Sequence, residues 1–424
     1  MPQLSFGKNA LLILAAESSH IIHTTLQEIE RLGGRIVHVY PPRILIGEIP
    51  PPIEAQVRAL ANIAEFHRGR VDLAAVERFG PAAVQAVKGW NRGFAASFRA
   101  LKSGRASEGK SWGSPDHAPE GPVQPPKGWN EPRSPRRDQP APGPGTSDYL
   151  IGKVAVNIII VEGKSSPYSF TPMERDTVVA EVQDGLGWLG SLEPKARVSW
   201  FYEIRTVTLD LDPAQVPDFS EDTWRDAAMA QLGYPASWDG LEQFVRARRT
   251  ALGTDWTLAI FITRFPLWHF AYAFKPRIVM NYDLDSWGIE DMDRIVAHET
   301  GHIFGAADEY AESKCSCSER FGYLQIENGN CELCAPTHVE CIMSHNTWAM
   351  CEYTRGQLGW RDSNGDGILD PLDEPMPTTA SVRLYSRLLE WLRRWLSTSR
   401  LLSRATSILP KDTAGGHTEL NRRL

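Results

Sequence analysis

The sequence predicts an α/β fold built on a mixed, twisted sheet. Apolar runs of strand length alternate with amphipathic helical patterns through most of residues 148–376, which is typical of α/β domains. A second, shorter set of strand and helix patterns precedes them in residues 1–73. The apolar fraction of 42% and the charged fraction of 23% fit a globular protein with a normal core.

Residues 1–73 are expected to form a small α+β unit. Its strands are "ALLILAA", the two halves of "RIVHVYPPRILIGEIP" and "AEFHRGRV", with a helical segment after the first and third strands. This βαββαβ order is the ferredoxin-like pattern. In pattern the unit resembles the inhibitory propeptides of subtilisin-type proteases. The alternative is a generic accessory domain without an inhibitory role.

Three other segments complete the predicted organisation. Residues 74–102 look helical, with a break near Gly80 and Pro81. Residues 103–147 are rich in proline and nearly lack aliphatic side chains, so a disordered linker is expected. If residues 1–73 are a propeptide, cleavage in this linker would release the catalytic domain. Residues 377–424 predict a basic amphipathic helix, which docks on the protein body or attaches to a membrane surface.

The main domain, residues 148–376, has a regular order of predicted elements. Three long apolar strands at 149–163, 196–211 and 256–263 alternate with helices at 173–192 and 240–252. A hairpin formed by 269–275 and 277–283 then leads into a helix over 289–305. The alternation indicates that helices cover a sheet.

The stretch "RIVAHETGHIFGAADEY", residues 294–310, carries the strongest chemical signal. His298 and His302 are four residues apart, so both imidazoles leave one face of the helix, where they can bind one zinc ion. Glu299 stands beside the first ligand, placed to deprotonate a water molecule. The alternative is a chance match, since the motif is short.

Gly305 follows His302 at the point where the helix should end, and glycine tolerates the backbone conformation of a helix C-cap. Asp308 comes three residues later. The segment resembles the metzincin metalloprotease signature, H-E-x-x-H-x-x-G-x-x-H, with Asp308 in place of the last histidine. That substitution is similar to snapalysin-type metzincins and implies that Asp308 is the third zinc ligand. Glu309 could compete, but the spacing favours Asp308.

The resemblance also implies a floor and a substrate strand. Met343 in "CIMSH" corresponds to the methionine turn that lies beneath the metal. His345 stands where some family members have a catalytic tyrosine, so a catalytic role is expected; a surface histidine is the alternative. An extended peptide substrate would pair with the edge strand near residues 269–275.

All six cysteines lie between Cys315 and Cys351. Their even number favours three disulfides that close a long loop beside the site. The alternative is a structural zinc held by Cys331 and Cys334 together with Cys315 and Cys317.

"DSNGDGILDPLD", residues 362–373, matches the spacing of a calcium loop. A calcium ion would be structural, and an ordinary polar turn is the alternative. The predicted ligands, at loop positions 1, 3, 5, 7, 9 and 12, are Asp362, Asn364, Asp366, Ile368, Asp370 and Asp373.

Together these features predict a zinc-dependent endopeptidase that acts on protein or peptide substrates. The net charge of −7 gives no reason to expect a nucleic-acid partner. Cysteine usage favours a secreted protein, whereas "ALLILAA" fits a buried strand better than a signal peptide, so a cytoplasmic enzyme is the alternative. The rival function is a non-catalytic protein-binding module stabilised by zinc and calcium.

Overall fold

The computed structural model describes residues 9–115, 145–211, 220–334 and 338–373. The chain divides into two compact units, Met1–Pro371 and Leu372–Leu424, and nearly all of the described residues belong to the first. The predicted basic helix in residues 377–424 lies outside the described part. No described helix has the length and apolar character that a membrane crossing requires.

A mixed sheet of nine strands runs through the first unit in the order β4-β1-β3-β2-β6-β5-β7-β9-β8. Strands β2, β6, β5, β7 and β9 are parallel, and the outer strands on both sides are antiparallel. This agrees with the predicted α/β class. The strands are β1 (Asn9–Leu14), β2 (Arg35–Tyr40), β3 (Ile44–Glu48), β4 (Ile63–His67), β5 (Lys153–Gly163), β6 (Ser199–Leu209), β7 (Trp256–Thr263), β8 (Ala271–Phe274) and β9 (Arg277–Asn281).

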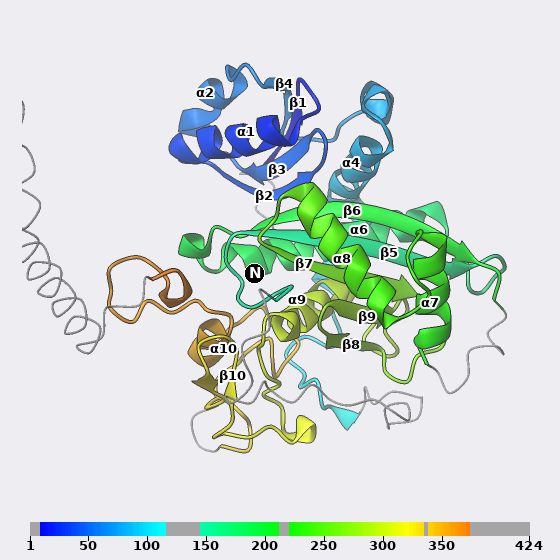
Figure 1. The fold of residues 1–424 in the computed structure, drawn as a ribbon, viewed down its shortest axis with the longest axis vertical. Helices are drawn as coiled ribbons and strands as arrows, with labels where there is room; N and C mark the ends of the chain where they lie inside the picture. Colours follow the sequence, from blue (N-terminus) through cyan, green and yellow to red (C-terminus); the bar gives the residue numbers. More distant parts are fainter. Residues whose placement is uncertain (1–8, 116–144, 212–219, 335–337, 374–424) are drawn as a thin grey trace, which may run out of the picture. The chain divides into compact units, whose positions relative to one another are not determined.

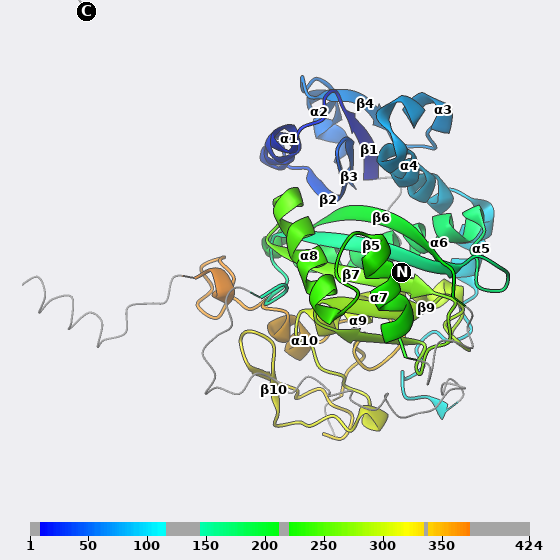
Figure 2. The ribbon, with the colours of Figure 1, turned by 45° about the vertical axis from the view of Figure 1, so that its right-hand side comes forward.

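Helices cover both faces of the central strands (Figures 1 and 2). On one face α7 (Asp222–Gln231) and α8 (Trp238–Leu252) pack against alternate residues of β5 such as Ile159. On the other face α6 (Pro172–Ser191) and α9 (Met292–Ile303) pack against the intervening residues, such as Ile158. Strands buried on both faces explain the continuous apolar runs in the sequence. Helix α7 was not predicted.

The first four strands follow the predicted βαββαβ order, with α1 (Ser19–Arg31) and the short α2 (Glu54–Arg58) between them. The predicted division into two separate domains is corrected, however. β2 pairs in parallel with β6, with His38 opposite Trp200 and Val39 opposite Phe201. Residues 9–67 therefore extend the sheet of the main domain and are part of the same compact unit.

The predicted helical segment is α3 (Leu73–Val76), α4 (Pro81–Gly93) and α5 (Ala96–Ser103), interrupted near Gly80 as expected. The predicted linker begins later than expected. Residues 104–115, called the strap below, follow the edge of the candidate site. Trp112 Nε1 donates a hydrogen bond of 2.6 Å to the carbonyl of Ile342, and the Trp112 side chain is 9% exposed. Of the remaining predicted linker, residues 116–144 lie outside the described residues.

Buried charges fasten the end of α5 and the beginning of the strap to α6 and α9. The amine of Lys102 lies 2.8 Å from the carboxylate of Asp293 and also bonds Glu181. The guanidinium of Arg105 lies 2.6 Å from the same Asp293 carboxylate. Buried charges are stable in a protein only when they are paired, so this network ties residues 102–105 to α9, the helix that carries His298 and His302.

Candidate metal centre

Helix α9 ends in a way that turns the chain back toward its own ligands. The amide of Ala306 donates to the carbonyl of Gly301, and the amide of Gly305 donates to the carbonyl of His302. These two bonds form a Schellman motif, which needs a left-handed residue at its centre. Gly305 has φ +94°, and a Cβ there would lie 2.8 Å from Cα of Gly322. The sequence prediction for Gly305 is therefore confirmed.

The three predicted zinc ligands come together at one point. Nε2 of His302 lies 3.0 Å from Nε2 of His298. Oδ1 of Asp308 lies 3.3 Å from Nε2 of His298 and 3.2 Å from Nε2 of His302. Two ligands that bind one tetrahedral zinc ion are about 3.4 Å apart, since each bond is about 2.0–2.1 Å long. The three atoms thus have the mutual separations of a zinc ligand set.

Backbone carbonyls orient both imidazoles. Nδ1 of His298 lies 2.9 Å from the carbonyl of Ile342, and Nδ1 of His302 lies 2.9 Å from the carbonyl of Ala306. A carbonyl can only accept, so each Nδ1 carries a proton, and each Nε2 keeps a lone pair when its ring is neutral. Such a second hydrogen bond is characteristic of histidines that bind metals. The turn after α9 therefore supplies Asp308 and also orients His302.

The electrostatics favour a positive charge at the centre of the three ligands. Burial opposes the charged form of His302, but the Asp308 carboxylate outweighs it and raises the pKa of His302 to about 9. Burial likewise opposes the charged form of Asp308, and the neighbouring His302 nevertheless lowers the pKa of this carboxyl. A cation that binds two imidazoles and a carboxylate supplies that charge directly.

Glu299 stands beside this group with an unengaged oxygen. Its side chain is 6% exposed, and its Oε2 has no hydrogen-bond partner among the described residues. Burial raises the pKa of this carboxyl. A buried carboxylate with a free oxygen and a raised pKa can take up a proton from a reacting molecule.

Met343, the predicted floor of the metal site, packs against α9. It is fully buried, and its sulfur would lie 2.9 Å from a Cβ placed on Gly301. Gly301 stands between the two histidines in sequence, so its lack of a side chain is what admits Met343. The same turn also orients a ligand, because the carbonyl of Ile342 accepts from His298.

Glu309 does not compete with Asp308. Its carboxylate is fully buried and accepts hydrogen bonds from Thr354 at 2.7 Å, Asn330 at 2.7 Å and the thiol of Cys351 at 3.0 Å. These partners hold it in a cluster of its own, where it anchors the segment that follows Asp308.

The sequence matches no protein-family model and no curated protein. The case for a function therefore rests on the site itself.

Among the described residues, no hydrogen bond or ion pair joins His345 to His298, His302 or Asp308. Its Nδ1 lies 2.9 Å from Oγ of Ser344, and its Nε2 lies 3.5 Å from Oε1 of Glu332. Burial lowers the pKa of His345. The predicted catalytic role of His345 gains no support from this position.

Two aromatic neighbours of the predicted ligands, Trp112 and His269, were not predicted from the sequence. The indole of Trp112 meets the ring of His298 edge-on at 5.3 Å between centroids. His269, which precedes β8, is close enough for the charges of Asp308 and His298 to influence its pKa, although burial has the larger effect and lowers it. The tryptophan was visible as an aromatic residue at the start of a segment with almost no aliphatic residues. Nothing in the sequence marked the histidine.

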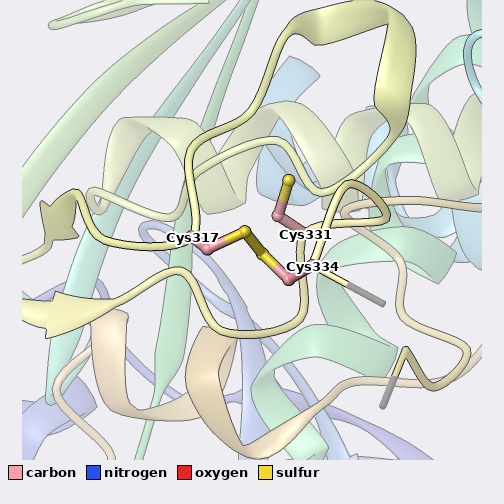
Figure 3. A group of neighbouring side chains, drawn as sticks. All are labelled: Cys317, Cys331 and Cys334. Atoms are coloured by element: carbon pink, nitrogen blue, oxygen red, sulfur yellow. A yellow bond between two sulfur atoms is a disulfide. The ribbon is translucent and has the colours of Figure 1, made fainter. Parts of the chain in front are cut away.

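Two disulfides link the cysteine-rich loop. Cys315 pairs with Cys331, and Cys317 pairs with Cys334. Figure 3 shows the second bond, with Cys331 beside it.

The prediction of three disulfides is wrong for the remaining pair, because Cys341 and Cys351 are buried free thiols. Cys351 uses its thiol as a donor to Glu309, and burial raises the pKa of Cys341, which makes this thiol unreactive.

Thiol titration distinguishes these arrangements. We expect two reactive thiols per chain when the protein, purified without reductant, is unfolded in guanidinium and treated with a thiol reagent. The same titration after reduction should give six, which serves as the control. A count of zero before reduction would mean that Cys341 and Cys351 are also joined. A count of six would instead favour cysteines that bind a structural zinc.

The predicted calcium ligands from Asp362 to Asp370 lie in one largely exposed loop but do not gather into a group of metal ligands. Asp362 accepts from the amides of Gly365 and Gly367, and the amine of Lys195 lies 2.8 Å from its carboxylate. The carboxylate of Asp370 accepts from Ser363. Among the described residues, the groups of three potential metal ligands include none from this loop. Calcium binding by the six predicted ligands stays a prediction.

Proposed function

We propose that this chain is a zinc-dependent endopeptidase with a metzincin-like site. The single observation that carries the proposal is the convergence of His298, His302 and Asp308 beside an unpartnered, buried Glu299. Three protein ligands with a nearby general base are typical of catalytic zinc sites, whereas structural sites usually have four protein ligands.

The residues present fit a zinc ion. The ligand set consists of two imidazole nitrogens and one carboxylate oxygen, and zinc accepts both types. Oδ1 of Asp308 is buried and makes no hydrogen bond that satisfies it, so a cation would provide its missing partner. Zinc bound there would supply Lewis acidity, which acidifies water and polarises a carbonyl group.

Glu299 performs the proton transfers in this proposal. Its free Oε2 accepts a proton from the attacking water and then delivers it to the amine of the departing peptide fragment. One proton is taken up and one is released, so the carboxylate is restored after each cycle. The pKa of Glu299, raised by burial, brings the carboxylate closer to the operating pH and so favours both transfers.

The edge strand β8 is the proposed substrate strand. It forms the outer edge of the nine-stranded sheet and pairs only with β9 among the described strands. β8 packs against α9, the helix that carries His298 and His302, so this edge lies beside the candidate metal centre. A peptide that adds to such an edge uses its backbone for binding, which suits a protease that accepts many sequences.

A non-catalytic zinc-binding module remains the second candidate function, and Glu299 argues against it. A structural site has no need for a buried carboxylate with a free oxygen, because burying a polar group without a partner lowers stability. We also propose that the protein works outside the reducing cytoplasm, because its two disulfides are typical of secreted proteins.

Peptide cleavage tests the proposal. The purified chain is incubated with a peptide library derived from a proteome, and new termini are identified by mass spectrometry. We expect cleavage at internal positions, its loss after treatment with a zinc chelator, and its return when zinc is added. A chain that binds zinc tightly but cleaves no peptide, protein or library member would favour the binding module.

A further inference from the structure

A second group of potential metal ligands lies outside the proposed catalytic centre. Glu332, His338 and His345 each offer one ligand atom, and these three atoms lie within 4.8 Å of one another. All three side chains are half-buried. Two histidines and a carboxylate are a ligand set that zinc accepts. The proposed peptidase mechanism gives this group no role.

The hydroxyl of Ser344 fixes the protons on both imidazoles. It donates its only proton to the carbonyl of Cys341 at 3.0 Å. Nδ1 of His345 lies 2.9 Å from the same oxygen, and Nε2 of His338 lies 3.2 Å from it. A hydroxyl oxygen offers one proton and two lone pairs. Because the proton is already used, both rings must donate, and each keeps its other nitrogen as an acceptor when neutral.

This leaves two electron-rich atoms facing each other. Nε2 of His345, now an acceptor, lies 3.5 Å from Oε1 of Glu332. The other oxygen of Glu332 accepts from the amide of Ala311 at 2.7 Å, which holds the carboxylate in place. A cation between the two atoms would satisfy both. Their separation is close to the roughly 3.4 Å expected for two ligands of a tetrahedral zinc ion.

We propose that Glu332, His338 and His345 form a second zinc site. The hydrogen bonds that both rings donate to Ser344 are of the kind that orient metal-binding histidines. The ligands come from the cysteine-rich loop and from the turn that carries Met343.

The position of this site gives it a structural purpose. The amide of Glu332 donates a hydrogen bond of 2.8 Å to the carbonyl of Glu309, the residue that directly follows Asp308. His345 belongs to the turn whose Ile342 carbonyl orients His298. A zinc ion here would therefore join the segment that supplies the third catalytic ligand to the turn that orients the first. The proposal concerns metal binding and does not depend on proteolytic activity.

Zinc stoichiometry tests this proposal. Each protein is stripped with a chelator, loaded with ZnCl₂, freed of excess zinc by gel filtration and analysed by atomic emission. We expect two zinc ions in the wild type and one in each of His338→Ala, Glu332→Gln and the double variant His298→Ala/His302→Ala. His20→Ala is the matched control, because His20 is exposed on α1, and it should keep two.

The outcomes separate the two sites. One zinc in the wild type and none in His298→Ala/His302→Ala would overturn the second site and leave the catalytic centre intact. A zinc ion that persists in the double variant and disappears when His338→Ala is added would establish the second site, even if no peptide is ever cleaved. Circular dichroism checks folding; if His338→Ala does not fold, Glu332→Gln and the double variant still decide the question.

Discussion

Replacing Glu299 with glutamine is expected to lower kcat for peptide cleavage by about 10²–10⁴-fold, the usual contribution of a general acid–base group. The amide has the shape of the carboxylate but cannot take up the proton of an attacking water. The zinc content should stay at the wild-type value, because Glu299 is not among the three converging ligands. The measurement is a steady-state assay with a peptide found in the library experiment, together with zinc analysis.

Glutamine should not unfold the protein. Burial raises the pKa of Glu299, which means that the folded state disfavours the charged carboxylate, and a neutral side chain removes that cost. We expect a thermal midpoint equal to or above that of the wild type. Glu352→Gln, the same change at an exposed position on α10 (Glu352–Gln357), is the control and should keep full activity. A Glu299→Gln variant that cleaves as fast as the control would remove the general base from this account.

The second prediction with a large effect concerns the stability of the fold and the buried Lys102. Lys102→Met should lower the free energy of unfolding by about 3–5 kcal/mol, the usual cost of removing one partner from a buried ion pair. Methionine fills the same space but leaves Glu181, which is fully buried, without its cation. It also takes one of two cations from Asp293. Urea unfolding followed by tryptophan fluorescence measures the change.

Lys88→Met is the matched control. The amine of Lys88 lies 3.9 Å from Asp176, and both side chains are partly exposed, so this change should cost less than about 1 kcal/mol. Equal midpoints for the two variants would show that the buried network does not hold residues 102–105 to α6 and α9. The expected difference would support an N-terminal part that is integral to the fold, since the network and the pairing of β2 with β6 both bind it to the main domain.

Local patterns were sufficient to predict the parts of the structure that depend on neighbours in sequence. The spacing of His298 and His302 puts them on one helical face, and Gly305 marks the end of that helix. The apolar runs of β5 and β7 identified buried strands because both faces are covered. Each of these features is decided within about ten residues.

Features that depend on distant contacts could not be predicted. The pairing of β2 with β6 joins residues far apart in the chain, and no local pattern specifies a partner strand. Trp112 was assigned to a linker because its neighbours lack aliphatic side chains, yet its own indole is buried against the turn at Ile342. The position of His345 depends on Ser344 and on Glu332, which a loop of unpredictable path brings near.

The proposed function requires that a zinc ion held by His298, His302 and Asp308 makes this chain a peptidase. Its most direct test is the rate of peptide cleavage by the metal-free chain during titration with zinc, in parallel with Asp308→Ala. We expect no cleavage without zinc, a rise in rate that saturates as the site fills, and a weaker response to zinc in the variant. A metal-free chain that cleaves at the full rate, or an Asp308→Ala chain that responds to zinc as the wild type does, would contradict it.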